Sequence, residues 1–411
     1  FGMSMSELSS LMALVHITQG IATPISGHAA DHLPGDTVVG GGVGILALGF
    51  GLTALMVTSW QVWLCYGFVC GAAYGLLNLN VFSVAVMRAM PEKYEGLAVG
   101  IATSGSTFGQ LALTPLFALV AQTWGWRYGY WVLCGCTTIL AFPTIILLKK
   151  SRMVHGANSK SKAFEDASDV IRRKDSAALN VSTKLCRLMR TWPYVALTIA
   201  FFICGVTTTG FIETHLISLS VHRNFDLATS AAAFSVLSAC NGLGMIIAGM
   251  LTDRYSRTVL LFSIFFGRAI CYVLLLVVRD GDTVGLFVFS ALFGLVDYSV
   301  VPPVVSLVGA HAGKECVGLG VGILLAWHSL GGAVGSILGG YLFDEVEGYS
   351  SALWCCSILC LLAAAACITI RHEPLVRKPE ESKAKRSGTV PESCMSGAGA
   401  PKFDAVEQIS L

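Results

Sequence analysis

Two charged side chains fall inside apolar segments, where charge is costly. Arg268 and Asp297 each lie about eleven residues from the same end of neighbouring apolar runs, so a helical rise of 1.5 Å per residue predicts similar depths. A charge at the middle of a bilayer costs roughly 2.5–3.5 kcal/mol on insertion scales and normally faces a cavity or a partner. We expect Arg268 to bind a solute carboxylate or gate its path, with Asp297 as its partner and as a proton carrier. The alternative is a permanent structural ion pair between the two helices.

Further polar residues in apolar segments could contact a solute or carry a proton. Glu213 and His215 are two residues apart, about 200° around a helix, so both cannot face one cavity. Histidine titrates near pH 6.5, which suits proton transfer, but a hydrogen-bonded interfacial role is the alternative for both residues. The remaining candidates for solute contact, each of which could instead form an interhelical hydrogen bond, are Asn78, Asn241 and His328.

The composition indicates which elements hold these side chains. Of 411 residues, 54% are hydrophobic and 13% charged, against about 25% charged in soluble proteins, and the mean hydropathy is +0.70. This excludes an ordinary water-soluble enzyme. A bilayer core requires about 20 apolar residues per helix, which predicts an all-α integral membrane protein. Eleven runs qualify: 8–26, 37–57, 61–87, 96–121, 128–148, 192–219, 229–251, 258–278, 284–308, 317–341 and 350–370.

The basic residues predict the orientation of these helices. Of the 27 Lys and Arg residues, 23 fall in alternate connections and the two polar segments, which are therefore expected on the cytoplasmic side. The predicted organisation is an N-terminal half over 1–148, a cytoplasmic linker over 149–191, a C-terminal half over 192–370 and a disordered cytoplasmic tail over 371–411.

The two halves repeat at one offset. Gly27 and Asp31 recur 222 residues later as Gly249 and Asp253, and the starts of the first five apolar runs map onto run starts in the second half within a residue. A duplication explains this agreement. The run at 192–219 has no counterpart, because its partner would precede residue 1. We therefore expect twelve helices, six in each half, of which the first is missing here.

Glycines recur at helical spacing in two runs. They form small-residue stripes that allow close helix packing, and we expect them at interfaces that rock against each other. The stripes are Gly96, Gly100, Gly105 and Gly109 in one run, and Gly331 and Gly335 in another.

Other classes of function lack a motif. The stretch Gly309–Glu315 has three residues between its glycines instead of four and no Ser or Thr after Lys314, so it does not match a phosphate loop. Hydrolase motifs are absent, no Cys and His residues sit at zinc spacing, and a net charge of +2 does not indicate nucleic acid. We expect no cofactor, metal, nucleotide or enzymatic activity.

The loop motif resembles that of the major facilitator superfamily. That superfamily carries G-x-L-x-D-R-x-G-R after the second helix of each half, and Gly249–Arg257 (GMLTDRYSR) matches it apart from Ser256. The first copy keeps Gly27 and Asp31 but has His32 and Asp36 where basic residues stand. The resemblance implies a conformational motif made of Gly27, Asp31, Gly249, Asp253, Arg254 and Arg257.

Within the superfamily, the chain is similar to the monocarboxylate-porter branch. Residues 93–109 (KYEGLAVGIATSGSTFG) resemble the branch pattern K-R-x-x-L-A-x-G-I-A-x-S-G-x-x-x-G. The resemblance implies two six-helix halves that rock about a midplane site and carry a small organic anion, a monocarboxylate, together with H⁺. Met245 stands where the branch has the basic residue that engages a carboxylate. The alternatives are therefore a non-transporting sensor or degenerate carrier, or a facilitator of a neutral or non-carboxylate solute.

Overall fold

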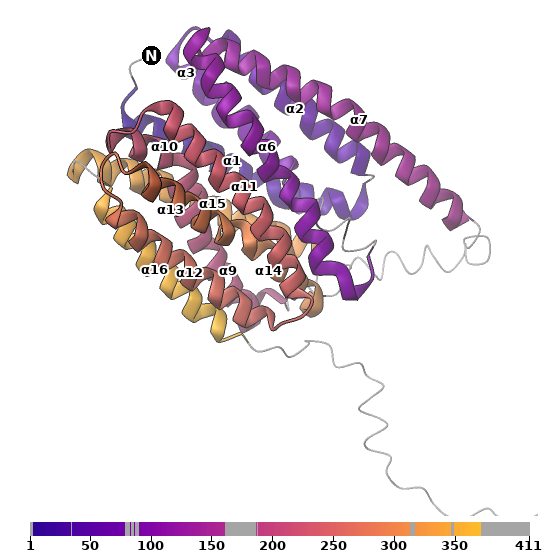
Figure 1. Cartoon of the computed structure of the whole chain (residues 1–411). Helices are drawn as coiled ribbons and strands as arrows, with labels where there is room; N and C mark the ends of the chain where they lie inside the picture. The colour runs from indigo at the N-terminus through magenta and orange to yellow at the C-terminus, as the bar shows by residue number, and fades with distance from the viewer. Residues whose placement is uncertain are drawn as a thin grey trace, which may run out of the picture. The chain divides into compact units, whose positions relative to one another are not determined.

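The computed structural model describes residues 3–33, 35–78, 83, 86, 90–160, 186, 188–312, 317–346 and 349–370, with only the backbone at some of them. The side chain of Asp31, most of the expected linker and all of the expected tail lie outside this description. Every regular element among the described residues is helical (Figure 1). This confirms the predicted all-α fold.

The described residues of the N-terminal half form four long helical segments and one interrupted one. These are α1 (Met5–His32), α2 (Gly35–Leu55), the continuous series α3 (Ser59–Val62), η1 (Trp63–Cys70) and α4 (Gly71–Leu76), then the short η2 (Glu92–Tyr94), α6 (Glu95–Thr123) and α7 (Trp126–Lys160). Helix α7 continues beyond residue 148, where the linker was expected to begin. Lys and Arg residues follow the apolar run, and both have good helix propensity. The change from apolar to charged residues therefore marks the end of the apolar run but not the end of the helix.

In the part of the C-terminal half that the structure describes, there are six membrane segments, two of them irregular. They are α9 (Trp192–Gly205) with η3 (Val206–Ile212) and α10 (Glu213–His222); α11 (Leu227–Thr252); α12 (Arg257–Val277); α13 (Thr283–Val296) with η4 (Tyr298–Val300) and α14 (Val301–Ala312); α15 (Val317–Val346); and α16 (Ser350–Ile368). Each matches a predicted run. The segment η3 is a π-helical stretch, a form that is frequent at functional sites.

Among the described residues, nine helices are long and apolar enough to cross a membrane. Two of the eleven predicted runs are not in this set. The run at 61–87 extends into residues outside the description, and α6 carries several Ser, Thr, Gly and Gln residues that lower its hydropathy.

The repeat determines how the two halves meet. The offset of 222 places α1 on α11 and α6 on α15, since Met5 and Glu95 correspond to Leu227 and Val317. In the structure, α1 packs along α15 and α6 packs along α11 (Figure 1). Each contact therefore joins α1, or its counterpart α11, in one half to α6, or its counterpart α15, in the other.

Glycines bring α6 and α11 into close contact at one end. A Cβ atom at Gly100 would lie 2.4 Å from the carbonyl oxygen of Met245, and one at Gly96 would lie 2.7 Å from that of Gly249. In contrast, a Cβ at Gly105 or Gly109 would meet nothing within 4 Å. The predicted stripe is therefore wrong for its second pair, because five residues from Gly100 to Gly105 turn the helix by about 140° to another face. The seam continues instead at Thr107, which lies 2.8 Å from the position of a Cβ at Gly242 of α11.

The second glycine stripe packs inside one half. Cβ atoms at Gly331 and Gly335 would lie 2.1 Å and 2.2 Å from the carbonyl oxygens of Phe202 and Val206, in α9 and η3. Close packing is confirmed at both positions, but it joins helices of the C-terminal half. The expectation of a rocking interface there is wrong.

Replacing Gly100 with alanine is expected to force α6 away from α11, whereas the same change at Gly105 is expected to be tolerated. Both changes gain helix propensity, but only the first overpacks a seam, which typically costs about 1–3 kcal/mol. Thermal unfolding of the purified variants measures the difference. Equal melting temperatures for Gly100→Ala and Gly105→Ala would contradict the packing described here.

Candidate functional site

The membrane segment formed by α13, η4 and α14 is broken at Asp297. Helix α13 ends at Val296, and Asp297 has φ −70° and ψ −86°, outside the helical region. Pro302 and Pro303 lie in the first turn of α14, where a missing N–H is tolerated, so this sequence favours a new helix start there. A break inside lipid requires partners for the freed backbone groups.

Asn241 provides one set of partners. Its Nδ2 donates to Asp297 Oδ2 at 2.9 Å, and its Oδ1 accepts from the backbone N–H of Tyr298 at 3.0 Å. Close approaches place it there, because Cβ atoms at Gly244 and Gly294 would lie 2.3 Å from carbonyl oxygens of α13 and α11, respectively. Asn241 thus holds the start of η4 and is completely buried.

Arg268 provides the other set. Its Nη2 donates to the carbonyl oxygens of Val296, at 3.0 Å, and Asp297, and its Nη1 donates to Cys204 Sγ at 3.1 Å. A positive charge at the C-terminal end of α13 also complements the helix dipole. Arg268 and Asp297 lie together as predicted, but the guanidinium bonds to the backbone carbonyl instead of the carboxylate. Since Arg268 is 0% exposed, this geometry favours the structural alternative over direct solute binding.

A second carboxyl group lies beside the break. The Tyr298 hydroxyl donates to Glu213 Oε1 at 3.0 Å and lies 3.2 Å from Thr209 Oγ1. Gln110 of α6, in the other half, lies near the Glu213 carboxyl group and influences it electrostatically. Glu213 therefore lies between the broken segment and the N-terminal half.

The other predicted residues are distributed differently. His328 is buried with its ring 6.4 Å from that of Tyr298, so it belongs to the group around the break. His215 faces away from Glu213, as the helical spacing predicts, and its Nε2 lies 3.0 Å from the Ser336 carbonyl oxygen. Asn78 donates to Thr23 within the N-terminal half at 3.2 Å.

Four residues around the break were not predicted from the sequence: Tyr298, Thr209, Cys204 and His16. Tyr298 and Thr209 are uncharged, so they do not stand out in an apolar run. The hydroxyl of a threonine in such a helix is usually bonded to the backbone of its own helix. The Pro302-Pro303 pair was the available signal, since it indicates a helix start just after Asp297.

One residue of the loop motif after α11 caps a helix of the other half. Asp253 accepts hydrogen bonds from the backbone N–H groups of Gly96, at 2.8 Å, and Leu97, at 3.0 Å, at the start of α6. This satisfies two of the free donors at a helix N-terminus. Arg254 is exposed and Arg257 half-buried, and Gly27 is buried in α1. Of the motif residues, Asp253 thus caps a helix of the other half.

Removing this cap with Asp253→Ala is expected to release the start of α6. Loss of an N-cap costs about 0.5–2 kcal/mol, which corresponds to about 2- to 30-fold faster amide exchange. Hydrogen exchange at Gly96 and Leu97 measures this directly, and Arg254→Ala is the control. Unchanged protection in Asp253→Ala would contradict the capping role.

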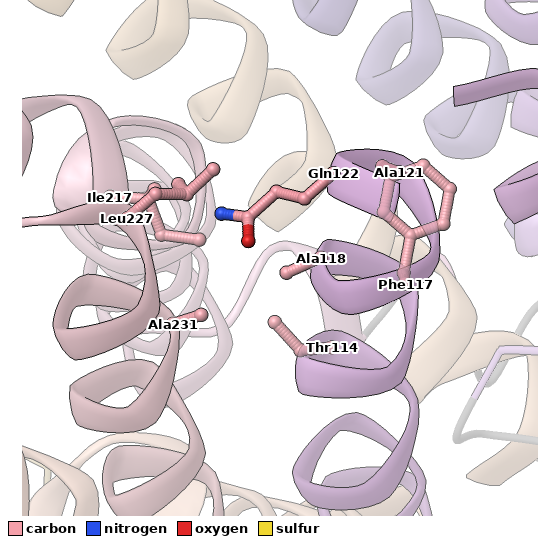
Figure 2. A pocket seen from close by; sticks show the side chains of 8 residues that line it. All are labelled: Thr114, Phe117, Ala118, Ala121, Gln122, Ile217, Leu227 and Ala231. Atoms are coloured by element: carbon pink, nitrogen blue, oxygen red, sulfur yellow. The ribbon is translucent and has the colours of Figure 1, made fainter. Parts of the chain in front are cut away.

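The opposite ends of α6 and α11 are separated by a pocket of about 320 Å³ (Figure 2). The Gln122 side chain reaches from α6 toward Ile217 of α10 and Leu227 of α11. The two halves are thus in contact near Asp253 and apart near Gln122. The pocket is lined by Thr114, Phe117, Ala118, Ala121, Gln122, Ile217, Leu227 and Ala231.

Curated relatives of this chain are membrane carriers. Mouse monocarboxylate transporter 12 is 23% identical over 387 residues, which cover 89% of this chain and 77% of the relative. Rat monocarboxylate transporter 13 is 21% identical over 373 residues, covering 89% and 80%. An uncharacterized MFS-type transporter of Bacillus subtilis, YcxA, is 26% identical over 308 residues, covering 72% and 71%.

Solved structures share the fold. The E. coli fucose:proton symporter matches with a TM-score of 0.57 at 15% identity, over 88% of this chain and 96% of that chain. The human organic anion transporter MFSD10 matches with a TM-score of 0.61 at 16% identity, over 87% and 83%.

A family model links these similarities. The model described as Major Facilitator Superfamily matches residues 1–323 and 216–405, which together span nearly the whole chain. The relatives are transporters, not enzymes, as the predicted motifs implied. The chain therefore belongs to the Major Facilitator Superfamily and, within it, is similar to the monocarboxylate transporters.

Proposed function

We propose that this protein carries a small organic anion, a monocarboxylate, together with a proton by alternating access. The observation that carries the proposal is the position of Glu213. Its carboxyl group accepts a hydrogen bond from Tyr298 at the broken segment and lies near Gln110 in the other half. A titratable group that contacts both halves can couple protonation to their relative movement.

The chemistry of this coupling follows from burial. A carboxylate in a low-dielectric site is costly, whereas the protonated acid is neutral and can donate a hydrogen bond. Rocking of the halves would change the access of Gln110 and water to Glu213, and with it the cost of the charge. Proton binding and the open side of the carrier are then linked.

In this proposal, Arg268 and Asp297 act as positioning residues. Arg268 holds the end of α13 and Asn241 holds the start of η4, with the Asp297 carboxylate between them. The broken segment keeps Tyr298 directed at Glu213. Loss of this framework would disturb transport without any direct contact between Arg268 and the solute.

The proposed orientation places the Asp253 end and the polar segments in the cytoplasm, because the basic residues concentrate there. The structure then corresponds to a carrier closed toward the cytoplasm, with the pocket near Gln122 on the outer side.

Met245 favours a second candidate, a facilitator of a neutral or non-carboxylate solute. Met245 is completely buried, and its carbonyl oxygen lies against Gly100 in the seam between α6 and α11. A thioether in this seam cannot engage a carboxylate. If the family's basic residue is essential for anion binding, this chain carries another solute.

Proton movement distinguishes the two candidates. The full-length protein is reconstituted into vesicles with an internal pH dye, and lactate, pyruvate or a neutral sugar is added outside. The anion carrier predicts internal acidification that exceeds that of protein-free vesicles and saturates with acid concentration. Uptake of the neutral solute without acidification would support the facilitator instead.

A further inference from the structure

A buried histidine pair lies where α1 and α15 meet. His16 of α1 is 5% exposed, and neither of its ring nitrogens has a hydrogen-bond partner among the described residues. Gln19, further along the same helix, is the polar side chain that lies beside the ring. A buried polar group without a partner typically costs about 1–3 kcal/mol. Such a cost is expected where a ligand completes the site.

The His16 ring packs against α15 at Gly332, one helical turn from His328. A Cβ atom at Gly332 would be 3.2 Å from His16 Cγ, and His328 is four residues before Gly332 on α15. His328 is 8% exposed, and the two imidazoles are close enough to interact electrostatically. The pair therefore spans the contact between the two halves.

The charged surroundings of the pair come from three other elements. Glu213, at the start of α10, and Arg268 of α12 both interact electrostatically with His328, and the Tyr298 ring of η4 lies 6.4 Å from it. Arg268 already donates to two carbonyl oxygens and a sulfur. Its Nε–H has no partner among the described residues, and protonated histidines would add further cationic donors beside the break.

We propose that His16 and His328, in their protonated forms, bind the carboxylate of the solute from opposite sides. Charge-assisted N–H donors from two imidazoles suit the two oxygens of one carboxylate. This inference rests on the proposed function and identifies the groups that recognise its cargo. It also explains how a chain with Met245 can retain anion recognition.

The assignment makes anion binding a source of coupling. The carboxylate stabilises the protonated imidazoles, so by linkage anion binding draws protons onto the pair. Since His16 belongs to one half and His328 to the other, the bidentate contact exists only while α1 and α15 stay together. Separation of these helices would release the anion, while Glu213 carries the transported proton.

Calorimetry with benzoate tests the site on the purified full-length protein. We expect binding at least tenfold tighter at pH 5.5 than at pH 8, because binding requires protonated imidazoles and their protonation becomes less costly as the pH falls. Titration in two buffers of different ionisation enthalpy should show uptake of about one proton per benzoate near pH 7. The neutral methyl ester of benzoate should not compete.

Histidine variants show whether His16 and His328 cause the pH-dependent binding of benzoate. His16→Gln and His328→Gln keep a polar side chain of similar length without the charge, and each should weaken benzoate binding at pH 5.5 about tenfold or more and flatten its pH dependence. His222→Gln, at an exposed histidine at the end of α10, is the matched control. The melting temperature confirms that each variant is folded.

Each outcome decides the inference. Unchanged affinity and pH dependence in both variants would overturn the histidine site, while proton-driven transport through Glu213 would stand. If a variant does not fold, the proton count of the wild type decides, and no proton uptake on binding overturns the site. Absence of saturable benzoate binding in the wild type also overturns it, and only the flux measurement then tests the proposed function.

Discussion

Replacing Glu213 with glutamine is expected to abolish proton-driven accumulation of the solute while retaining solute exchange. Glutamine keeps an oxygen that accepts the hydrogen bond from Tyr298 but cannot take up a proton. A gradient of one pH unit supplies about 1.36 kcal/mol per proton, enough for about tenfold accumulation in the wild type. The variant should reach only the external concentration. Uptake and counterflow of labelled lactate in vesicles measure the two activities separately.

Two companion variants sharpen this prediction. Glu345→Gln removes an exposed acid at the end of α15 and should accumulate lactate normally. Asp297→Asn retains an oxygen for Asn241 Nδ2 and should accumulate lactate if Asp297 is a positioning residue. Uphill accumulation by Glu213→Gln would contradict the assignment of the proton to Glu213. Loss of lactate accumulation in Asp297→Asn would instead assign the transported proton to Asp297.

Replacing Arg268 with alanine is expected to destabilise the C-terminal half and abolish transport together. The change removes the donors to the carbonyl oxygens of Val296 and Asp297. Each buried acceptor left without a partner costs about 1–3 kcal/mol. Thermal unfolding should show a melting temperature lowered by several degrees, in parallel with lost flux.

The Arg268→Lys variant separates charge from geometry. Lysine restores the positive charge at the end of α13 but not the planar fork that reaches two carbonyls and a sulfur. We expect its stability to lie between those of the wild type and Arg268→Ala. A normal melting temperature in Arg268→Ala with loss of transport alone would instead support direct binding of the solute by Arg268. Normal flux would exclude both roles.

The sequence predicts much of the scaffold because its signals are periodic and repeated. The apolar runs correspond to the helices. The offset of 222 residues relates the first residue of α1 to that of α11, and the first residue of α6 to that of α15. Depth counting along two runs also brings Arg268 and Asp297 together. Lengths and spacings of this kind survive in any helical packing.

The details of the site depend on contacts that spacing does not encode. Gly100 and Gly105 have equivalent sequence signals, but only Gly100 lies where α6 and α11 touch. Arg268 bonds to carbonyl oxygens because α13 ends at Val296, and this end is visible only in the three-dimensional path of the chain. His16 is one of several polar residues in α1, so its unpartnered ring emerges only from the packing of α1 against α15.

Accumulation of labelled lactate in vesicles containing the full-length protein, under an inward proton gradient, tests proton-coupled carriage. Coupled carriage predicts a transient rise of internal lactate above the equilibrium level of protein-free vesicles, which a protonophore collapses. It also predicts that the rise becomes larger as the imposed gradient increases. Accumulation no greater than in protein-free vesicles, for lactate, pyruvate and benzoate alike, would contradict proton-coupled carriage of a monocarboxylate.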